Sequence, residues 1–122
     1  MNIDDLTIGE AKKLAALLGG TPAPAFQSAH VGKYVIVRTY SAGVHIGVLK
    51  RKAGREVELT EARRIWNWNG AKTLSEMSLK GLDAANSRVS ETVASIELTE
   101  AIEVLPCTAE AETNLRGAKW TK

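Results

Sequence analysis

The amino-acid sequence predicts an α+β fold: an antiparallel β meander with a long C-terminal strand, two short helices packed on it, and a separate N-terminal helix. Three observations support this prediction. Short turn segments at 41–43 and 52–55 separate stretches of β-branched and aromatic residues. Residues 93–105 follow a period-2 apolar pattern, and threonine caps precede the expected helices.

The first 30 residues read as a helix followed by a linker. Thr7 and Glu10 have the capping-box spacing, and glycines at 19–20 end the helix. Residues 19–30 are rich in Gly, Pro and Ala. We therefore divide the chain into an N-terminal amphipathic helix and linker (1–30) and an α+β ligand-binding domain (31–122). A helix this short needs a partner for its apolar face, in the main domain or a neighbouring subunit. That face comprises Ile8, Ala11, Leu14, Ala15 and Leu18.

Three strands with short connections are expected next. The first spans 33–40, the second begins at Val44, and the third runs from Val57 to Trp68. A helix at 73–81 follows, with Thr73 and Glu76 as its capping box.

The C-terminal part is expected to hold one long strand and a last helix. Residues 83–91 are polar and turn-rich, and 93–105 form the strand, with a bulge or strand edge at Glu100. Pro106 closes that strand, and Thr108 caps a helix to Leu115. The residues expected to share one face of the strand are Ile96, Leu98, Ile102 and Val104.

Composition excludes several function classes. One cysteine and two histidines argue against a structural zinc site, so no metal ligand is assigned. The sequence contains no dinucleotide-binding glycine motif, Walker loop or nucleophile elbow, and neither a catalytic residue nor a cofactor is expected. A net charge of +2 argues against nucleic acid as a partner. The chain has no apolar run of membrane-spanning length and no secretory segment, so we expect a cytoplasmic protein.

Two reactive-looking groups have simpler interpretations. A Cys107–His45 pair is conceivable, but a lone cysteine beside a proline is more often packed than nucleophilic. Glu97, Glu100 and Glu103 lie in the long strand and read as a solvated edge.

The first candidate ligand site is the hairpin 38–45. It combines an arginine, two hydroxyls, an imidazole and a glycine turn whose amides can hold an anion. The alternative is a plain hairpin turn with Tyr40 packed on the sheet. The candidate residues are Arg38, Tyr40, Ser41, Gly43 and His45.

The second candidate site is the stretch 62–70. In a regular strand Arg64, Trp66 and Trp68 share one face, and Arg63 lies on the other. Arginine pairs with phosphate, and indole offers a flat surface on which a base stacks. The alternative is that both tryptophans are core residues covered by arginine stems.

The basic tail adds a third group. It could close over an anionic ligand or fray as chain ends do. Its residues are Arg116, Lys119, Trp120 and Lys122.

Three segments resemble a group of small phage proteins: residues 35–47, 62–75 and 98–106, within a match that covers about 31–120. This group resembles the first anti-Thoeris family, sponges that sequester a cyclic ADP-ribose signal made by bacterial TIR-domain defence proteins. The resemblance implies a compact, oligomeric α+β protein that binds a signalling nucleotide without cleaving it. It also implies that related proteins hold cyclic di- or trinucleotides of another defence pathway. The site residues it implies are the hairpin 38–45 with Arg63, Arg64, Trp66 and Trp68.

The leading hypothesis is therefore a phage-encoded, non-enzymatic protein that sequesters a cyclic nucleotide in the infected bacterial cell. Tight binding of a small ligand needs near-complete enclosure, so we expect a homo-oligomer, a dimer or hexamer. The alternative is a protein-interaction module that docks on a host or phage protein through the Trp/Arg face. A phosphoesterase is a third reading, which the missing metal motif disfavours.

Overall fold

The computed structural model describes residues 28–121. The predicted N-terminal helix and most of the linker lie outside this range. No helix in the described part has both the length and the apolar character of a membrane span. The elements along the chain are β1 (Tyr34–Thr39), β2 (Val44–Ala53), β3 (Glu56–Asn67), α2 (Leu74–Lys80), the 3-10 helix η2 (Ala84–Asn86), β4 (Arg88–Val89), β5 (Val93–Leu98), β6 (Ala101–Pro106) and α3 (Ala109–Gly117).

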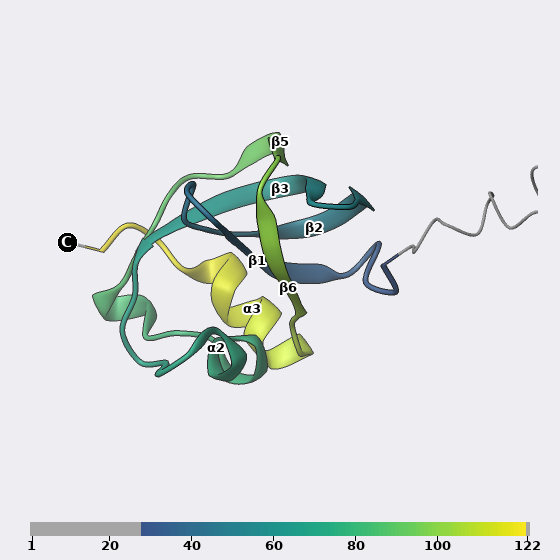
Figure 1. The fold of residues 1–122 in the computed structure, drawn as a ribbon. Helices are drawn as coiled ribbons and strands as arrows, with labels where there is room; N and C mark the ends of the chain where they lie inside the picture. The colour runs from purple at the N-terminus through teal and green to yellow at the C-terminus, as the bar shows by residue number, and fades with distance from the viewer. Residues whose placement is uncertain (1–27, 122) are drawn as a thin grey trace, which may run out of the picture.

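The strands form one antiparallel sheet in the order β4-β3-β2-β1-β6, and β5 also pairs with β3. The meander β1-β2-β3 and the α+β class are therefore confirmed. The two helices predicted at 73–81 and 108–115 are present and lie together on one side of the sheet (Figure 1). Each begins at the predicted threonine cap: Thr73 accepts from the Glu76 amide, and Thr108 from the Ala111 amide.

The prediction of a single long C-terminal strand is wrong. The chain breaks after Leu98, and its two halves pair with different neighbours: β5 with β3, and β6 with β1. The prediction that the apolar residues of this strand share one face is wrong as well, because the β1–β6 register passes over Ile102. Arg38 pairs with Glu103 and Thr39 with Ala101, which leaves Ile102 as the bulged residue with 51% of its surface exposed.

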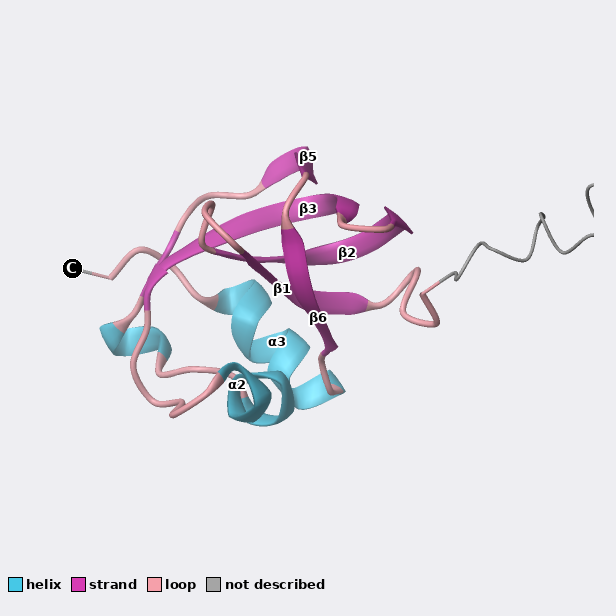
Figure 2. Ribbon diagram, in the orientation of Figure 1, coloured by secondary structure: helices cyan, strands magenta, loops and turns pink. Residues whose placement is uncertain are grey.

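The short β5–β6 link shows that the sheet curls. Leu98 and Ala101 are three residue steps apart, a reach of about 11 Å at most. In a flat sheet, β5 and β6 would lie four strand spacings apart, about 19 Å. The two edges must therefore approach each other, and Figure 2 shows β6 crossing in front of the meander while β5 lies along β3.

Two clusters of buried side chains lie on the two faces of this curled sheet. The helix-side core lies against α2 and α3 and comprises Tyr34, Ile36, Ile46, Ile65, Met77, Leu82, Val89, Leu115 and Ala118. The inner core lies on the face towards β5 and β6 and comprises Val35, Val37, Leu49, Val57, Leu59, Ala62, Leu98 and Ala101.

A bulge in β3 changes which residues face the inner core. Ile46 pairs with Arg63 and Val48 with Thr60, so β3 carries one residue more than β2 over this interval. Glu61 lies there with a φ of 52°, in the left-handed region. Because of this extra residue, Leu59 and Ala62 both belong to the inner core, although strict alternation would place them on opposite faces.

Residues 83–91, expected to be a polar connection, contain η2 and β4. β4 is only two residues long and pairs with the end of β3, Val89 opposite Ile65. So short a strand carries no periodic signal, which is why its pattern is invisible in the sequence.

Candidate functional site

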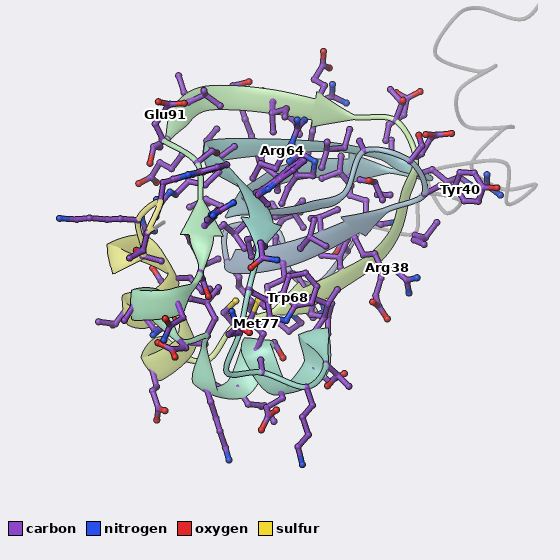
Figure 3. The ribbon with its side chains drawn as sticks, turned by 90° about the vertical axis from the view of Figure 1, so that its left-hand side faces the viewer. Arg38, Tyr40, Arg64, Trp68, Met77 and Glu91 are labelled. Carbon is purple, nitrogen blue, oxygen red and sulfur yellow. The ribbon has the colours of Figure 1, made fainter. Side chains whose placement is uncertain are left out.

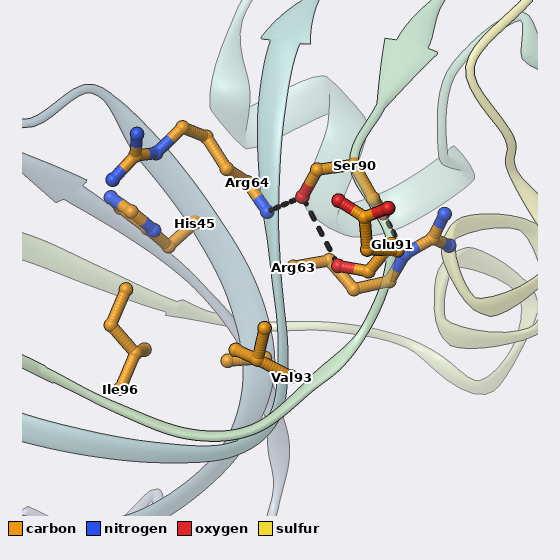
Figure 4. Close-up of a pocket in the computed structure, with 8 residues that line it drawn as sticks. His45, Arg63, Arg64, Ser90, Glu91, Val93 and Ile96 are labelled. Atoms are coloured by element: carbon orange, nitrogen blue, oxygen red, sulfur yellow. Dashed lines mark hydrogen bonds between the residues drawn. The ribbon is translucent and has the colours of Figure 1, made fainter.

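A pocket of about 190 Å³ opens on the inner face of the sheet, between β2, β3 and the segment that leads from β4 into β5. Its polar wall is formed by His45, Arg64, Ser90 and Glu91, and its apolar wall includes Val93 and Ile96 (Figure 4).

Strand pairing positions the two basic groups of the pocket. His45 on β2 and Arg64 on β3 are direct cross-strand partners, so their side chains leave the sheet on the same face. The bulge at Glu61 places Arg64 in phase with Ala62, towards the inner face. The Arg64 side chain is exposed, and no ion pair engages it within residues 28–121. A free guanidinium at the pocket is a group that an anionic ligand can pair with.

Ser90 locks the main chain of Arg64 in place. The Arg64 amide donates to Ser90 Oγ (2.9 Å), and the Ser90 amide donates to the Arg64 carbonyl (2.9 Å). The Ser90 hydroxyl in turn donates to the Glu91 carbonyl (3.2 Å). These bonds therefore hold β3 and the segment that follows β4 together at the pocket, although β4 is short.

His45 is fully buried, with 0% of its surface exposed. Its Nε2 lies 3.0 Å from the Ala42 carbonyl, and its Nδ1 has no hydrogen-bond partner among residues 28–121. Burial lowers the pKa of His45; the charge of Arg64 lowers it further, while the Ala42 carbonyl opposes the shift. The ring is therefore neutral near pH 7.

Arg63 lies on the opposite face of β3, and 8% of its surface is exposed. Its Nη1 donates to the carbonyls of Leu115 (2.9 Å) and Arg116 (3.2 Å) at the end of α3, and its Nε donates to the Ser90 carbonyl (2.8 Å). Figure 4 shows the Arg63 and Arg64 side chains leaving β3 in opposite directions. Arg63 thus ties α3 to the sheet behind the pocket.

An exposed aromatic pair lies further along β3. Trp66 lies at a second irregularity of β3, between Ile65, which pairs with Val89, and Asn67, which pairs with Arg88; 65% of its surface is exposed. Its ring is stacked with that of Trp120, with centroids 6.5 Å apart and an interplanar angle of 23°. The guanidinium of Arg88 lies 5.8 Å from the Trp120 centroid. A bridge between Arg88 and Trp120 holds this part of the tail on the sheet.

Trp68 does not share the face of Arg64, contrary to the prediction. β3 ends at Asn67, and Trp68 turns towards the helix-side core. Its Nε1 donates to the Ala71 carbonyl (3.2 Å), and Figure 3 shows it close to Met77. Trp68 and Arg38 line a second cavity, of about 400 Å³, on this side.

The rest of the hairpin 38–45 lies away from the pocket. Tyr40 is 79% exposed, so the alternative in which it packs on the sheet is wrong. Ser41 Oγ donates to the Glu100 carboxylate. Gly43 has a φ of 85°, and its carbonyl accepts from both the amide and the hydroxyl of Thr39. These hydrogen bonds lie within the turn and stabilise it.

Arg116 is engaged on the helix side. Its guanidinium pairs with Glu61 (2.9 Å) and Glu112 (2.7 Å) and lies 4.5 Å from the ring centroid of Tyr34. Two carboxylates thus neutralise it, and it does not line the pocket of His45 and Arg64. Of the residues predicted for the ligand site, His45, Arg63 and Arg64 line this pocket, with the Arg63 guanidinium directed away from it towards the end of α3, and Trp66 is not among the lining residues.

Three groups near the pocket were not predicted as site residues: Arg88, Ser90 and Glu91. They come from the polar segment whose pairing with β3 only the fold reveals. Among residues 28–121, no group of three or more His, Cys, Asp or Glu side chains is arranged to hold a metal ion.

A family model described as a domain of unknown function, DUF6948, matches residues 32–115. The chain belongs to the DUF6948 family. The DUF6948 match contains all six strands, α2, and the pocket residues from His45 to Ile96, while Trp120 lies beyond it. No curated protein matches the chain. The DUF6948 match assigns no activity.

Proposed function

We propose that this protein binds a cyclic nucleotide signal of the cyclic ADP-ribose type and holds it without cleaving it. In this proposal it is a phage-encoded anti-defence protein that acts in the cytoplasm of the infected bacterial cell. The observation that carries the proposal is a polar pocket lined by Arg64, which is free of ion pairs within residues 28–121, with the exposed Trp66 two residues further along the same strand.

Each part of such a ligand has a counterpart in these residues. The Arg64 guanidinium pairs with a phosphate oxygen, because its planar fork matches phosphate geometry. The exposed indole of Trp66 offers a stacking surface for the base. Arg88, beside Trp120, supplies a second positive charge for a diphosphate.

The volume of the pocket supports a role for a second copy of the chain. At about 190 Å³ it is smaller than the roughly 300–1,000 Å³ of pockets that enclose a whole small-molecule ligand. One protomer therefore encloses one ring of the nucleotide and leaves the rest on the aromatic face. A homo-oligomer, a dimer or hexamer, would cover that remainder and provide the affinity that sequestration needs.

The hydrogen bonds of the pocket favour binding over cleavage. A hydroxyl nucleophile needs an adjacent base to remove its proton. The Ser90 hydroxyl donates to the Glu91 carbonyl, and the Nε2 of His45 is directed at the Ala42 carbonyl. Neither group is arranged to activate the other.

Native mass spectrometry with cyclic ADP-ribose isomers and cyclic di- and trinucleotides tests the proposal. We expect a defined oligomer that carries intact nucleotide at a fixed ratio, and heating should release that nucleotide chemically unchanged. Arg64→Ala should weaken binding at least tenfold. The matched control is Arg38→Ala, another exposed arginine that lies at the other cavity, and it should bind like the wild type. Recovery of a cleaved product would instead indicate an enzyme.

The exposed pair Trp66–Trp120 with Arg88 favours one second candidate, a protein-docking module. Tryptophan and arginine are enriched among residues that dominate binding energy at protein interfaces. This reading predicts no nucleotide affinity and the loss of one specific host or phage partner in Trp66→Ala. Tight nucleotide binding that depends on Arg64 would contradict it.

A further inference from the structure

The pocket contains one hydrogen-bonding atom that the fold leaves unused, the Nδ1 of His45. A carbonyl oxygen only accepts hydrogen bonds, so the 3.0 Å contact between His45 Nε2 and the Ala42 carbonyl requires the hydrogen on Nε2. In the neutral ring, Nδ1 then carries a lone pair and acts as an acceptor. In the part of the chain that the structure describes, no donor lies within hydrogen-bond distance of this atom, although His45 is fully buried.

The groups that face His45 across the pocket do not fill this role. Arg64, its cross-strand neighbour, is exposed and directs a positive charge at the pocket. The Ser90 hydroxyl already donates its hydrogen to the Glu91 carbonyl. Val93 and Ile96 carry no polar side-chain atom. The ionised Glu91 carboxylate is itself an acceptor. Figure 4 shows the imidazole beside Arg64, with Ile96 on its other side.

Buried polar atoms in native proteins nearly always find a partner. A buried acceptor without a partner, on a residue that lines the pocket and pairs across the strands with the unpaired cation Arg64, is therefore a complement to a ligand that has both a donor and a negative charge. A pocket of about 190 Å³ admits one ring of such a ligand.

We infer that His45 Nδ1 accepts a hydrogen bond from a neutral O–H or N–H group of the bound nucleotide, while Arg64 pairs with its phosphate. The donor is a ribose hydroxyl or the exocyclic amine of the base. His45 is then a specificity residue: a nucleotide without this donor leaves a buried acceptor unpaired and is bound more weakly. This inference rests on the proposed function.

The same arrangement makes binding depend on pH. Protonation of His45 places a hydrogen on Nδ1, so the acceptor is lost and two positive charges face each other at His45 and Arg64. Affinity is therefore expected to fall as the pH drops through the pKa of His45. The other charged residues that line the pocket are Glu91 and Arg63, whose guanidinium is bonded to the end of α3. A Glu91→Gln variant should retain the pH dependence.

Two substitutions at His45 test the hydrogen-bond acceptor separately from the shape of the ring. His45→Phe removes both nitrogens, whereas His45→Asn keeps an oxygen close to the position of Nδ1. Calorimetric titration should show at least a tenfold loss of affinity for cyclic ADP-ribose in His45→Phe and partial recovery in His45→Asn. Circular dichroism and urea unfolding check that each variant is folded.

Analogues of cyclic ADP-ribose identify the donor. A deoxyribose analogue and a hypoxanthine analogue each remove one candidate group. The analogue that lacks the true donor should bind at least tenfold more weakly than cyclic ADP-ribose to the wild type, and equally weakly to His45→Phe. The inference is overturned, while nucleotide binding stands, if two results are obtained together. The wild-type protein binds both analogues as tightly as cyclic ADP-ribose, and His45→Phe binds cyclic ADP-ribose as tightly as the wild type does.

Nitrogen-15 spectra of histidine-labelled protein test the acceptor without any variant. We expect the free protein to show His45 with its hydrogen on Nε2, and the Nδ1 resonance to shift when nucleotide is added. A hydrogen on Nδ1 in the free protein would overturn the inference by itself. If no nucleotide of the panel binds at all, the proposed function and this inference both fail.

Discussion

Gly47 on β2 lies directly against the bulged segment of β3: a Cβ added at Gly47 would lie 2.8 Å from the carbonyl oxygen of Thr60. It would also lie 3.2 Å from the Cα of Ala62. The close approach of the two backbones therefore requires glycine at this position. Gly47 thus makes room for the bulge between Thr60 and Ala62, which precedes Arg64 on β3.

Gly47→Ala is expected to destabilise the protein by about 1–3 kcal/mol, because the contacting atoms belong to the backbone and cannot swing away. Urea unfolding measures this loss. Gly117→Ala is the matched control: an alanine there meets no atom within 4 Å. Equal stability of the two variants would show that the bulge does not depend on the glycine.

Arg63→Met should cost about 2–4 kcal/mol, because it leaves the buried carbonyls at the end of α3 without their charged donor. Arg64→Met, one residue further along, removes an exposed arginine and should change stability by less than about 0.5 kcal/mol. Thermal or urea unfolding of the pair gives the comparison. A similar effect in both variants would contradict the role of Arg63 in tying α3 to the sheet.

Cys107 should react slowly with thiol reagents in the folded protein. Burial, together with the nearby charge of Glu112, raises the pKa of the Cys107 thiol to about 12. Since the thiolate is the reactive form, alkylation by iodoacetamide at pH 8 should be at least about a hundredfold slower than in urea-unfolded protein. Rapid alkylation of the folded protein would instead point to a reactive cysteine.

Tyr34 should make the protein less stable at alkaline pH. Burial raises the pKa of Tyr34 to about 12, against the opposing charges of Arg116 and Arg63. The unfolded chain ionises this tyrosine near pH 10. Its contribution to stability is thus complete below about pH 10 and is lost as the pH rises towards 12, by about 2–3 kcal/mol. Tyr34→Phe lacks this group, so the stability difference between variant and wild type should change over that interval and stay constant below it.

Local signals in the sequence predicted much of the fold. The turn residues at 41–43 and the β-branched runs around them specify β1 and β2, because turn chemistry and strand propensity act over a few residues. The caps Thr73 and Thr108 located both helices for the same reason, since each bonds an amide within its own first turn.

The errors occurred where partners distant in the sequence decide the structure. The apolar alternation of 93–105 was read as one strand, but the edges of β1 and β3 take up its two halves separately. Arg63 and Arg64 are chemically identical neighbours in the sequence. Only the end of α3, some fifty residues later, determines that Arg63 is the buried, hydrogen-bonded arginine and Arg64 the exposed one.

The sequence by itself determined the α+β class, the meander, the two capped helices, and His45 and Arg64 as candidate residues. The tertiary structure alone decided which of the candidates meet. The β3 bulge over Gly47 turned Arg64 inwards beside His45, and the short strand β4 completed the pocket with Ser90 and Glu91. The physical reason is that propensity and capping are local, whereas strand register, curl and the burial of a side chain depend on segments that meet only when the chain folds.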